Sequence, residues 1–280
     1  PIADYVATID WGDGSTTTAG TVGLASGSTF NVTGSHTYTQ SGKFMATVSI
    51  KDDGGAKAAA TTIVINGHTA ADDVAAFVEA AYDNLMGRAA DPGGLSAFTN
   101  AIASGTSPAA AAATMTQSNE FLDNVIQQAY RDYLGRDAEA SGLQFWLSQM
   151  RQGLNDAQLD AGFIGSPEFF NHSGATNTAW VNEMYFDLLG RAPDTGGLAY
   201  WLNALTQGAD RAAVALGFAA SVEHEALAIQ SSYQTYLGRS ASQAEVNAWV
   251  KAYEQGMTNE AIVAGFVGSK EFFQQQTADD

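Results

Sequence analysis

A motif that recurs four times with fixed internal spacing constrains the fold of this 280-residue chain more than any other feature. Each copy has a Gly-Arg pair, a Tyr six residues before the Arg, a Phe or Trp ten after it, a Gly seventeen after it, and a Ser-x-Glu starting thirty after it. The arginines are Arg88, Arg136, Arg191 and Arg239, spaced by 48, 55 and 48 residues. Such regularity excludes coincidence and predicts a supersecondary unit that packs against its own copies.

The recurring positions are those that begin and end helices. Each Gly before an Arg suits the left-handed conformation that ends a helix, and the Arg is predicted to donate hydrogen bonds and positive charge to the free carbonyls of that helix end. Ser, Asp, Asn and Thr recur where the next helices must start, and they are favoured N-caps. The predicted N-caps are Asp91, Asp194, Ser242, Ser107, Asn155, Asp210, Thr258, Ser118, Ser166, Ser221 and Ser269, with Glu139 as the poor member.

The first part of the chain has a different character, because residues 1–67 contain no Glu and alternate Thr, Ser, Val and Gly in short runs. Strands are predicted at Tyr5–Ile9, Phe44–Ile50 and Thr61–Ile65, with Gly/Asp turns between them. The sequence therefore predicts a multidomain protein, with a boundary near Asn66–Thr69. Its parts are a small antiparallel β-sandwich over residues 1–67, a first pair of α-helical repeats over 70–170, and a second pair over 178–280.

Composition excludes several classes of protein. Thirty acidic against 12 basic residues give a net charge of −18, which argues against nucleic acid and anionic membranes as partners. No run approaches about 18 apolar residues, so no transmembrane segment is predicted. The absence of cysteine excludes disulfides and thiolate metal sites. The chain has no initiator Met and no leader, and its composition is typical of a secreted bacterial surface protein, so we expect an excised or mature piece of one.

The sequence contains few signals of catalysis. The four histidines form no paired metal-binding arrangement, and there is no nucleophile elbow, phosphate loop or dinucleotide fingerprint. Acid pairs such as Glu223/Glu225 would suit a glycosidase, but the recurring Glu lies where a helix start favours negative charge. The chain is therefore predicted not to be an enzyme.

Calcium is the predicted cofactor. Asp10, Asp13, Asp52 and Asp53 follow or bracket predicted strand ends, and oxygen-rich loops suit hard cations. We expect these four carboxylates to converge at one end of the sandwich. The alternative is ordinary turn chemistry, in which each Asp side chain accepts hydrogen bonds from its own turn.

Aromatic residues outside the recurring positions are the candidates for ligand binding. The recurring Tyr, Trp and Phe are expected to be core residues, whereas Trp180, Tyr200 and Tyr253 are predicted to form an exposed face for a ligand such as a sugar. The longest segment that the repeats do not share, Asn171–Thr178, is predicted to be either a binding loop or a linker between the pairs.

Three motifs in the first part resemble the polycystic-kidney-disease-type (PKD) immunoglobulin-like domain. They are Ile9–Ser15 (IDWGDGS), Gly34–Tyr38 (GSHTY) and Val48–Gly55 (VSIKDDGG), in the order of that family. The resemblance implies an extracellular spacer or binding module. Because the chain starts so close to the first motif, the leading strands of the family are expected to be missing and the sandwich incomplete.

The repeats resemble a bacterial family called domain of unknown function 4214. The segment Tyr185–Trp201 (YFDLLGRAPDTGGLAYW), together with Ser166–Phe169 (SPEF), carries the resemblance, which extends over residues 72 to 276. The family is similar in helical layout to phycobilisome linker domains, which is a more distant likeness. The resemblance implies an exported protein and no established activity.

The expected function is binding or assembly outside the cell or at the bacterial cell surface. The expected partners are a polysaccharide, a surface protein or a second copy of the chain, as in adhesion or in surface-layer or matrix attachment. Two alternatives stay open: an extracellular carbohydrate-active enzyme domain, and an inert spacer in a larger exported protein.

Overall fold

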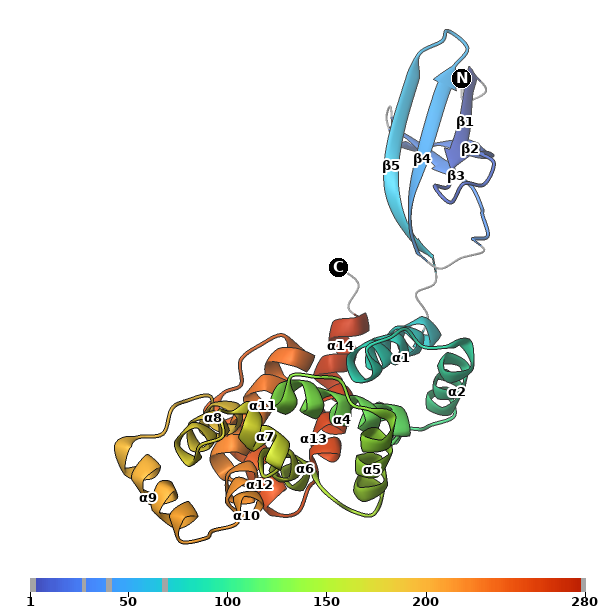
Figure 1. Ribbon diagram of the computed structural model, residues 1–280. Coiled ribbons are helices and arrows are strands. Elements are labelled where there is room, and N and C mark those ends of the chain that lie inside the picture. The colour runs from blue at the N-terminus through green and yellow to red at the C-terminus, as the bar shows by residue number, and fades with distance from the viewer. Residues whose placement is uncertain (1–3, 27–28, 39–41, 67–69, 278–280) are drawn as a thin grey trace. The chain divides into compact units, whose positions relative to one another are not determined.

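The computed structural model describes residues 4–26, 29–38, 42–66 and 70–277 (Figure 1). The chain divides into two compact units between Asp73 and Val74, and each unit is described by itself. Strand β5 ends at Asn66 and helix α1 begins at Ala70. The remaining residues of the predicted boundary, 67–69, lie outside the described residues.

The first unit is an antiparallel sheet with the strand order β3-β2-β1-β4-β5. The strands are β1 (Tyr5–Asp10), β2 (Thr18–Ser26), β3 (Thr29–Thr33), β4 (Gly42–Asp52) and β5 (Lys57–Asn66). The three predicted strands are confirmed as parts of β1, β4 and β5, and β2 with β3 completes a curled sheet (Figure 1). Side chains alternate along β1, where Ala7 and Ile9 are buried and Val6 is exposed, as the two-residue period of a strand requires.

The second unit is all-α, as predicted. The first pair of repeats contains α1 (Ala70–Met86), α2 (Pro92–Ala103), α3 (Pro108–Thr116), α4 (Asn119–Leu134), α5 (Ala140–Arg151), α6 (Asp156–Ile164) and α7 (Pro167–His172). The second pair contains α8 (Asn177–Leu189), α9 (Thr195–Thr206), α10 (Arg211–Ala219), α11 (Val222–Leu237), α12 (Gln243–Glu254), α13 (Asn259–Val267) and α14 (Lys270–Thr277).

The ends of these helices confirm the predicted glycine C-termini and the predicted N-caps. Gly87, Gly135, Gly190 and Gly238 have φ values between 62° and 67°, the left-handed conformation that glycine adopts without strain. Each predicted Ser, Asp, Asn or Thr N-cap accepts a hydrogen bond from the backbone N–H three residues later, whereas Glu139 makes no side-chain cap bond. The local sequence therefore determines where these helices begin and end.

The two pairs pack against each other through two equivalent helix contacts. Helix α3 of the first pair lies on α13 of the second, and α6 of the first lies on α10 of the second. A Cβ added to Gly165 would lie 2.6 Å from the Cα of Ala212, and one added to Gly268 would lie 2.3 Å from the Cα of Ala109. Since α13 is the repeat equivalent of α6, and α10 that of α3, the two contacts exchange under an approximate twofold relation.

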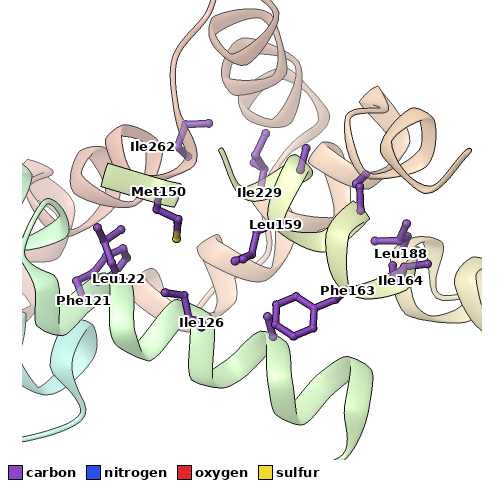
Figure 2. Close-up of a cluster of buried hydrophobic side chains, with 14 of the residues drawn as sticks. Phe121, Leu122, Ile126, Met150, Leu159, Phe163, Ile164, Leu188, Ile229 and Ile262 are labelled. Atoms are coloured by element: carbon purple, nitrogen blue, oxygen red, sulfur yellow. The ribbon is translucent and has the colours of Figure 1, made fainter. Parts of the chain in front are cut away.

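A single hydrophobic core joins the two pairs. Figure 2 shows side chains of the first pair, such as Ile126 and Leu159, in one cluster with Leu188, Ile229 and Ile262 of the second. All five are nearly inaccessible to solvent. Among the described residues, no single helix is long and apolar enough to cross a membrane, although α10 and α11 together, which are bent by 52°, meet those criteria by length and composition alone.

Candidate functional site

The recurring Tyr, Arg and Glu form one bonded group in every repeat unit. In the second of the four repeats, Arg136 Nε donates to Glu168 Oε1 at 2.6 Å and Nη2 donates to Oε2 at 2.9 Å. Its guanidinium lies 4.9 Å from the centre of the Tyr130 ring. The other three units repeat the group with the residues Tyr82–Arg88–Glu120, Tyr185–Arg191–Glu223 and Tyr233–Arg239–Glu271. A two-bonded Arg–carboxylate pair beside a stacked ring holds the end of one helix to the start of another 32 residues away.

The prediction that each Arg donates to the carbonyls of the preceding helix end holds only for the backbone, where Arg136 N–H donates to Tyr130 O at 3.5 Å and Arg239 N–H to Tyr233 O at 3.4 Å. The guanidinium does not make these bonds. The Nη1 of Arg88 and of Arg136 donates instead to the carbonyl of the residue that follows it. The helix-end carbonyls accept bonds from the backbone, as when Gly135 N–H donates to Arg131 O at 3.1 Å. Hydrogen bonds from Arg136 hold the pKa of Glu168 below its ordinary value. The recurring ionisable residues are thus engaged in the fold.

The four aspartates of the predicted calcium site do not converge. Tyr5 pairs with Asp52 and Asp10 pairs with Thr47, so Asp10 and Asp52 lie at opposite ends of β1, about 16 Å apart at the usual rise per residue. Asp10 and Asp52 accept hydrogen bonds from turn amides at 3.0 and 2.7 Å, and the backbone N–H of Asp53 donates to the Asp4 carbonyl. The expectation of one shared site is therefore wrong.

Asp13 belongs to a polar and aromatic cluster instead. Its Oδ2 lies 2.7 Å from His36 Nε2, and its Oδ1 accepts from the Ser15 N–H. A hydrogen bond from the Ser15 side chain, followed by those from His36 and from the Ser15 backbone, lowers the pKa of Asp13 to about 2. The His36 ring stacks on Trp11, and the Tyr38 hydroxyl donates to the Trp11 carbonyl. The first two resemblance motifs thus meet in one structural cluster.

Trp180 is fully buried, so the prediction that it belongs to an exposed face is wrong. Its indole N–H donates to the Ile164 carbonyl at 2.8 Å, which holds α8 to the end of α6. Trp180 also lies within the repeat register, because Phe77 occupies the same place five residues before a recurring Tyr. Phe77 is buried as well and contacts Phe272 across the chain. The equivalence of these two positions was the signal that sequence reasoning missed.

Two exposed aromatic residues share one repeat position, nine residues after the Arg. Tyr200 is 65% exposed, in agreement with its predicted exposure, and Phe145 is 55% exposed. Each presents its ring edge-on to the neighbouring Trp, at 4.9 Å between Tyr200 and Trp201 and 5.2 Å between Phe145 and Trp146. Sequence reasoning did not identify Phe145, although its position relative to Arg136 marks it.

A cavity of about 290 Å³ lies between the two pairs. Its polar lining comes from α4, α6, α11, the end of α12 and the start of α13. These residues are Gln128, Asp132, Tyr133, Asp156, Asp160, His224, Glu225, Tyr253 and Asn259. Tyr253, a predicted ligand residue, is partly buried here. Four carboxylates with one histidine is an unusual composition for a cavity between helices.

Three of these residues depart from the apolar pattern of the repeats. The two residues that directly follow each Ser-x-Glu are apolar in three of the repeats. They are Phe121-Leu122, Phe169-Phe170 and Phe272-Phe273, whereas the third repeat has His224-Glu225. Asp160 likewise lies at a position where the other three repeats have Ala112, Ala215 and Val263. This departure is visible in the sequence, but only the fold brings the three residues to one place.

Hydrogen bonding in the cavity leaves its carboxylates incompletely paired. His224 Nδ1 lies 2.7 Å from the Leu188 carbonyl, so this nitrogen carries a hydrogen, and Nε2 lies 3.7 Å from Asp160 Oδ2. Glu225, only 2% exposed, accepts one bond of 3.3 Å from Asn259. The Asp156 Oδ1 is enclosed and has no hydrogen-bond partner among the described residues.

Burial shifts the pKa values of these acids upward. It raises the pKa of Asp160 to about 6, against the opposing effect of His224. Burial, together with the charges of Glu260, Asp160 and Glu225, raises the pKa of Asp156 well above its ordinary value. The pKa of Glu225 is raised by burial too. Within the described residues, no group of three or more such side chains is placed to hold a metal ion.

Comparison with known proteins matches the helical repeats to one family. The sequence profile described as "Domain of unknown function (DUF4214)" matches residues 67–125, 123–172, 160–228 and 229–276. These four consecutive matches correspond to the four repeat units. No curated protein and no solved structure matches the chain.

Proposed function

The chain belongs to the DUF4214 family, and on this basis we propose that it is a non-catalytic module for binding or assembly in an extracellular or cell-surface bacterial protein. The ligand class is a polysaccharide or a surface protein. The observation that carries the proposal is the pair of exposed aromatic rings at Phe145 and Tyr200. Aromatic faces bind sugar rings and apolar protein surfaces.

The remaining recurring residues support a binding role by elimination. Their glycines end helices, their Ser, Thr, Asp and Asn residues cap them, and their Tyr, Arg and Glu bond to one another. A rigid scaffold of this kind leaves the ligand contacts to residues that vary among the units. Phe145 and Tyr200 vary in this way, since units one and four have Ala97 and Ala248 at the same position.

A glycan-array screen with matched variants tests this proposal. Tyr200→Ala and Phe145→Ala each restore the alanine that two units already carry, so folding should be unaffected. We expect the double variant to lose at least about 90% of the binding signal, since a stacked aromatic contact contributes on the order of 1 kcal/mol or more. Phe186→Ala, which removes an exposed ring of α8, is the control and should bind as the wild type. Equal binding by the double variant and the wild type would contradict the proposal.

A second candidate function is a carbohydrate-active enzyme domain. The observation in its favour is the cavity in which Asp160 and Glu225 have raised pKa values, since such carboxylic acids suit general acid catalysis. Hydrolysis of a polysaccharide panel that disappears in Glu225→Gln would favour this function over binding. A chain that neither binds nor hydrolyses any of these polymers would instead be a spacer.

The first unit is proposed to be a PKD-like module. The cluster of Trp11, Asp13, His36 and Tyr38 supports this, because the motifs that carry the resemblance contact one another. Calcium binding stays a prediction. Titration calorimetry at millimolar calcium, with Asp13→Asn as the variant, would detect a site in this unit.

A further inference from the structure

The acidic cavity lies across the interface between the two helical pairs. Asp156 and Asp160 come from α6 of the first pair, and His224 and Glu225 come from α11 of the second. Asp156 interacts with Glu225 and with Glu260 of α13, so carboxylates of both pairs face each other. When ionised, these groups repel across a poorly hydrated gap, where charge interactions are stronger than in water.

The ionisable groups that face this gap are predominantly acidic on every packed element. Those that line the cavity are Asp132 and Tyr133 of α4, Asp156 and Asp160 of α6, His224 and Glu225 of α11 and Tyr253 of α12. The charges of Asp187 of α8 and Glu260 of α13 act on Tyr133 and Asp156 from nearby. His224 is the only base among them, at 3.7 Å from Asp160. One histidine cannot neutralise three enclosed carboxylates.

The twofold relation supplies an internal comparison. The position of Glu225 corresponds to Leu122, which is buried, and that of Asp160 corresponds to Val263. His224 corresponds to the buried Phe121. The three equivalent positions are therefore apolar, although a cavity of about 320 Å³ lined by Leu122 lies on that side too. The fold itself does not require acids at these positions.

We propose that the interface between the two helical pairs is a proton-controlled contact, closed when the cavity carboxylates are protonated and loosened when they ionise. The raised pKa values support this assignment. For a carboxylate whose pKa is raised on folding, the stabilisation is fully present below the pKa of the unfolded chain and is lost as the pH rises through the folded-state pKa. For Asp160, stability should fall over the pH range from 3.8 to about 6, between its ordinary and its folded-state pKa. The raised pKa of Asp156 extends this pH range upward.

The recurring Arg–Glu pairs affect stability over a different pH range. The pKa values of Glu120, Glu168, Glu223 and Glu271 are lowered, each mainly by its Arg partner. Their stabilisation is present above the ordinary Glu pKa of 4.5 and is lost only as the pH falls below it. Between pH 5 and 7.5, the pH dependence should therefore come from the cavity acids together with Asp187, whose pKa burial raises to about 7.

Thermal unfolding of the full chain between pH 5 and 7.5 tests the proposal. We expect the Tm of the wild type to fall by about 5 °C over this range. In Asp160→Val/Glu225→Leu, which installs the residues of the equivalent positions, the Tm at pH 7.5 should rise and the dependence should flatten. Asp160→Asn/Glu225→Gln, which keeps the shapes, should flatten it even if the apolar variant fails to fold. Asp83→Asn, at an exposed site of α1, is the control and should behave as the wild type.

A distance measurement separates loosening from a mere change in stability. The chain has no cysteine, so spin labels can be placed at Gln144→Cys in α5 and Asn247→Cys in α12, both exposed and equivalent by repeat. We expect the distance distribution to broaden from pH 5 to pH 7.5 in the wild type and to stay narrow in both double variants. An unchanged wild-type distribution, or the same pH dependence of Tm in the wild type and the variants, would overturn the proposal.

Discussion

At the scale of single residues, one arginine in each unit connects three parts of the fold. Arg136 stacks on Tyr130, bonds to Glu168, and reaches Glu139 with Nη1 at 2.6 Å. In the fourth unit the second acid is Glu245, which stands where the other units have a glycine. Different local sequences thus supply the same guanidinium with a carboxylate.

We predict that Arg136→Ala lowers the Tm by about 2–4 °C, because it removes a paired charge and a ring contact at the same time. Solvent screening at this exposed site keeps the effect small. Arg131→Ala, which breaks only an exposed pair with Asp137, is the control. A Tm for Arg136→Ala equal to that of Arg131→Ala would show that the stacked pair contributes nothing beyond surface charge.

A second residue-scale prediction concerns acid. Because Arg136 holds the pKa of Glu168 below its ordinary 4.5, the stabilisation from this pair should be lost as the pH falls below that value. Glu168→Gln should therefore lower the Tm at pH 6 but matter less and less towards pH 3. Thermal unfolding of both proteins at intervals over this range measures it, and a constant difference would contradict it.

At the scale of helices, glycines inside the third helix of a unit set how closely the second helix approaches. A Cβ at Gly162 would lie 2.4 Å from the Trp146 ring, and one at Gly265 would lie 2.6 Å from Trp249. Trp146 stacks on Phe163 and Trp249 stacks on Phe266, with angles of 24° and 26° between the ring planes. Trp201 of the third unit is tilted by 56°, and nothing lies within 4 Å of a Cβ at its Gly217.

This difference predicts opposite outcomes for the same substitution. Gly162→Ala should destabilise the chain by about 1–3 kcal/mol, the usual cost of overpacking. Gly217→Ala should stabilise it by about 0.5–1 kcal/mol, because alanine loses less backbone entropy in a helix. Urea unfolding of the two variants measures both signs, and the same sign for both would refute this account of the glycines.

At the scale of the whole helical unit, the twofold contact of the pairs depends on small residues. Gly268 faces Ala109 and Gly165 faces Ala212, each too closely for an added Cβ. We predict that Gly268→Val separates α13 from α3 and lowers the Tm by more than 5 °C, since several helix contacts open together. Gly217→Val, at an unobstructed helical position without a left-handed φ, is the control. An equal loss in both variants would mean that close packing is not what matters.

Sequence reasoning succeeded where the determinants are local and failed where they are not. A capping Ser or a left-handed Gly acts within a few residues of itself, so the helix ends followed directly from the repeat. The partner of Arg136 lies 32 residues away, and the sheet register that separates Asp10 from Asp52 depends on tertiary structure. The cavity could not be predicted for the same reason, although His224 and Glu225 were visible as departures from an apolar pattern.

The twofold exchange of α3 and α6 contacts has a consequence for the ancestry of the chain. Two identical subunits that associate in this way would present every interface residue twice, so an acid at one site would always be matched by an acid at the other. Joining the two copies in one polypeptide removes that constraint. The first pair has Leu122 at the position where the second has Glu225. A single chain with two copies of the fold can therefore form an asymmetric, charged cavity within a twofold arrangement, which a homodimer cannot do.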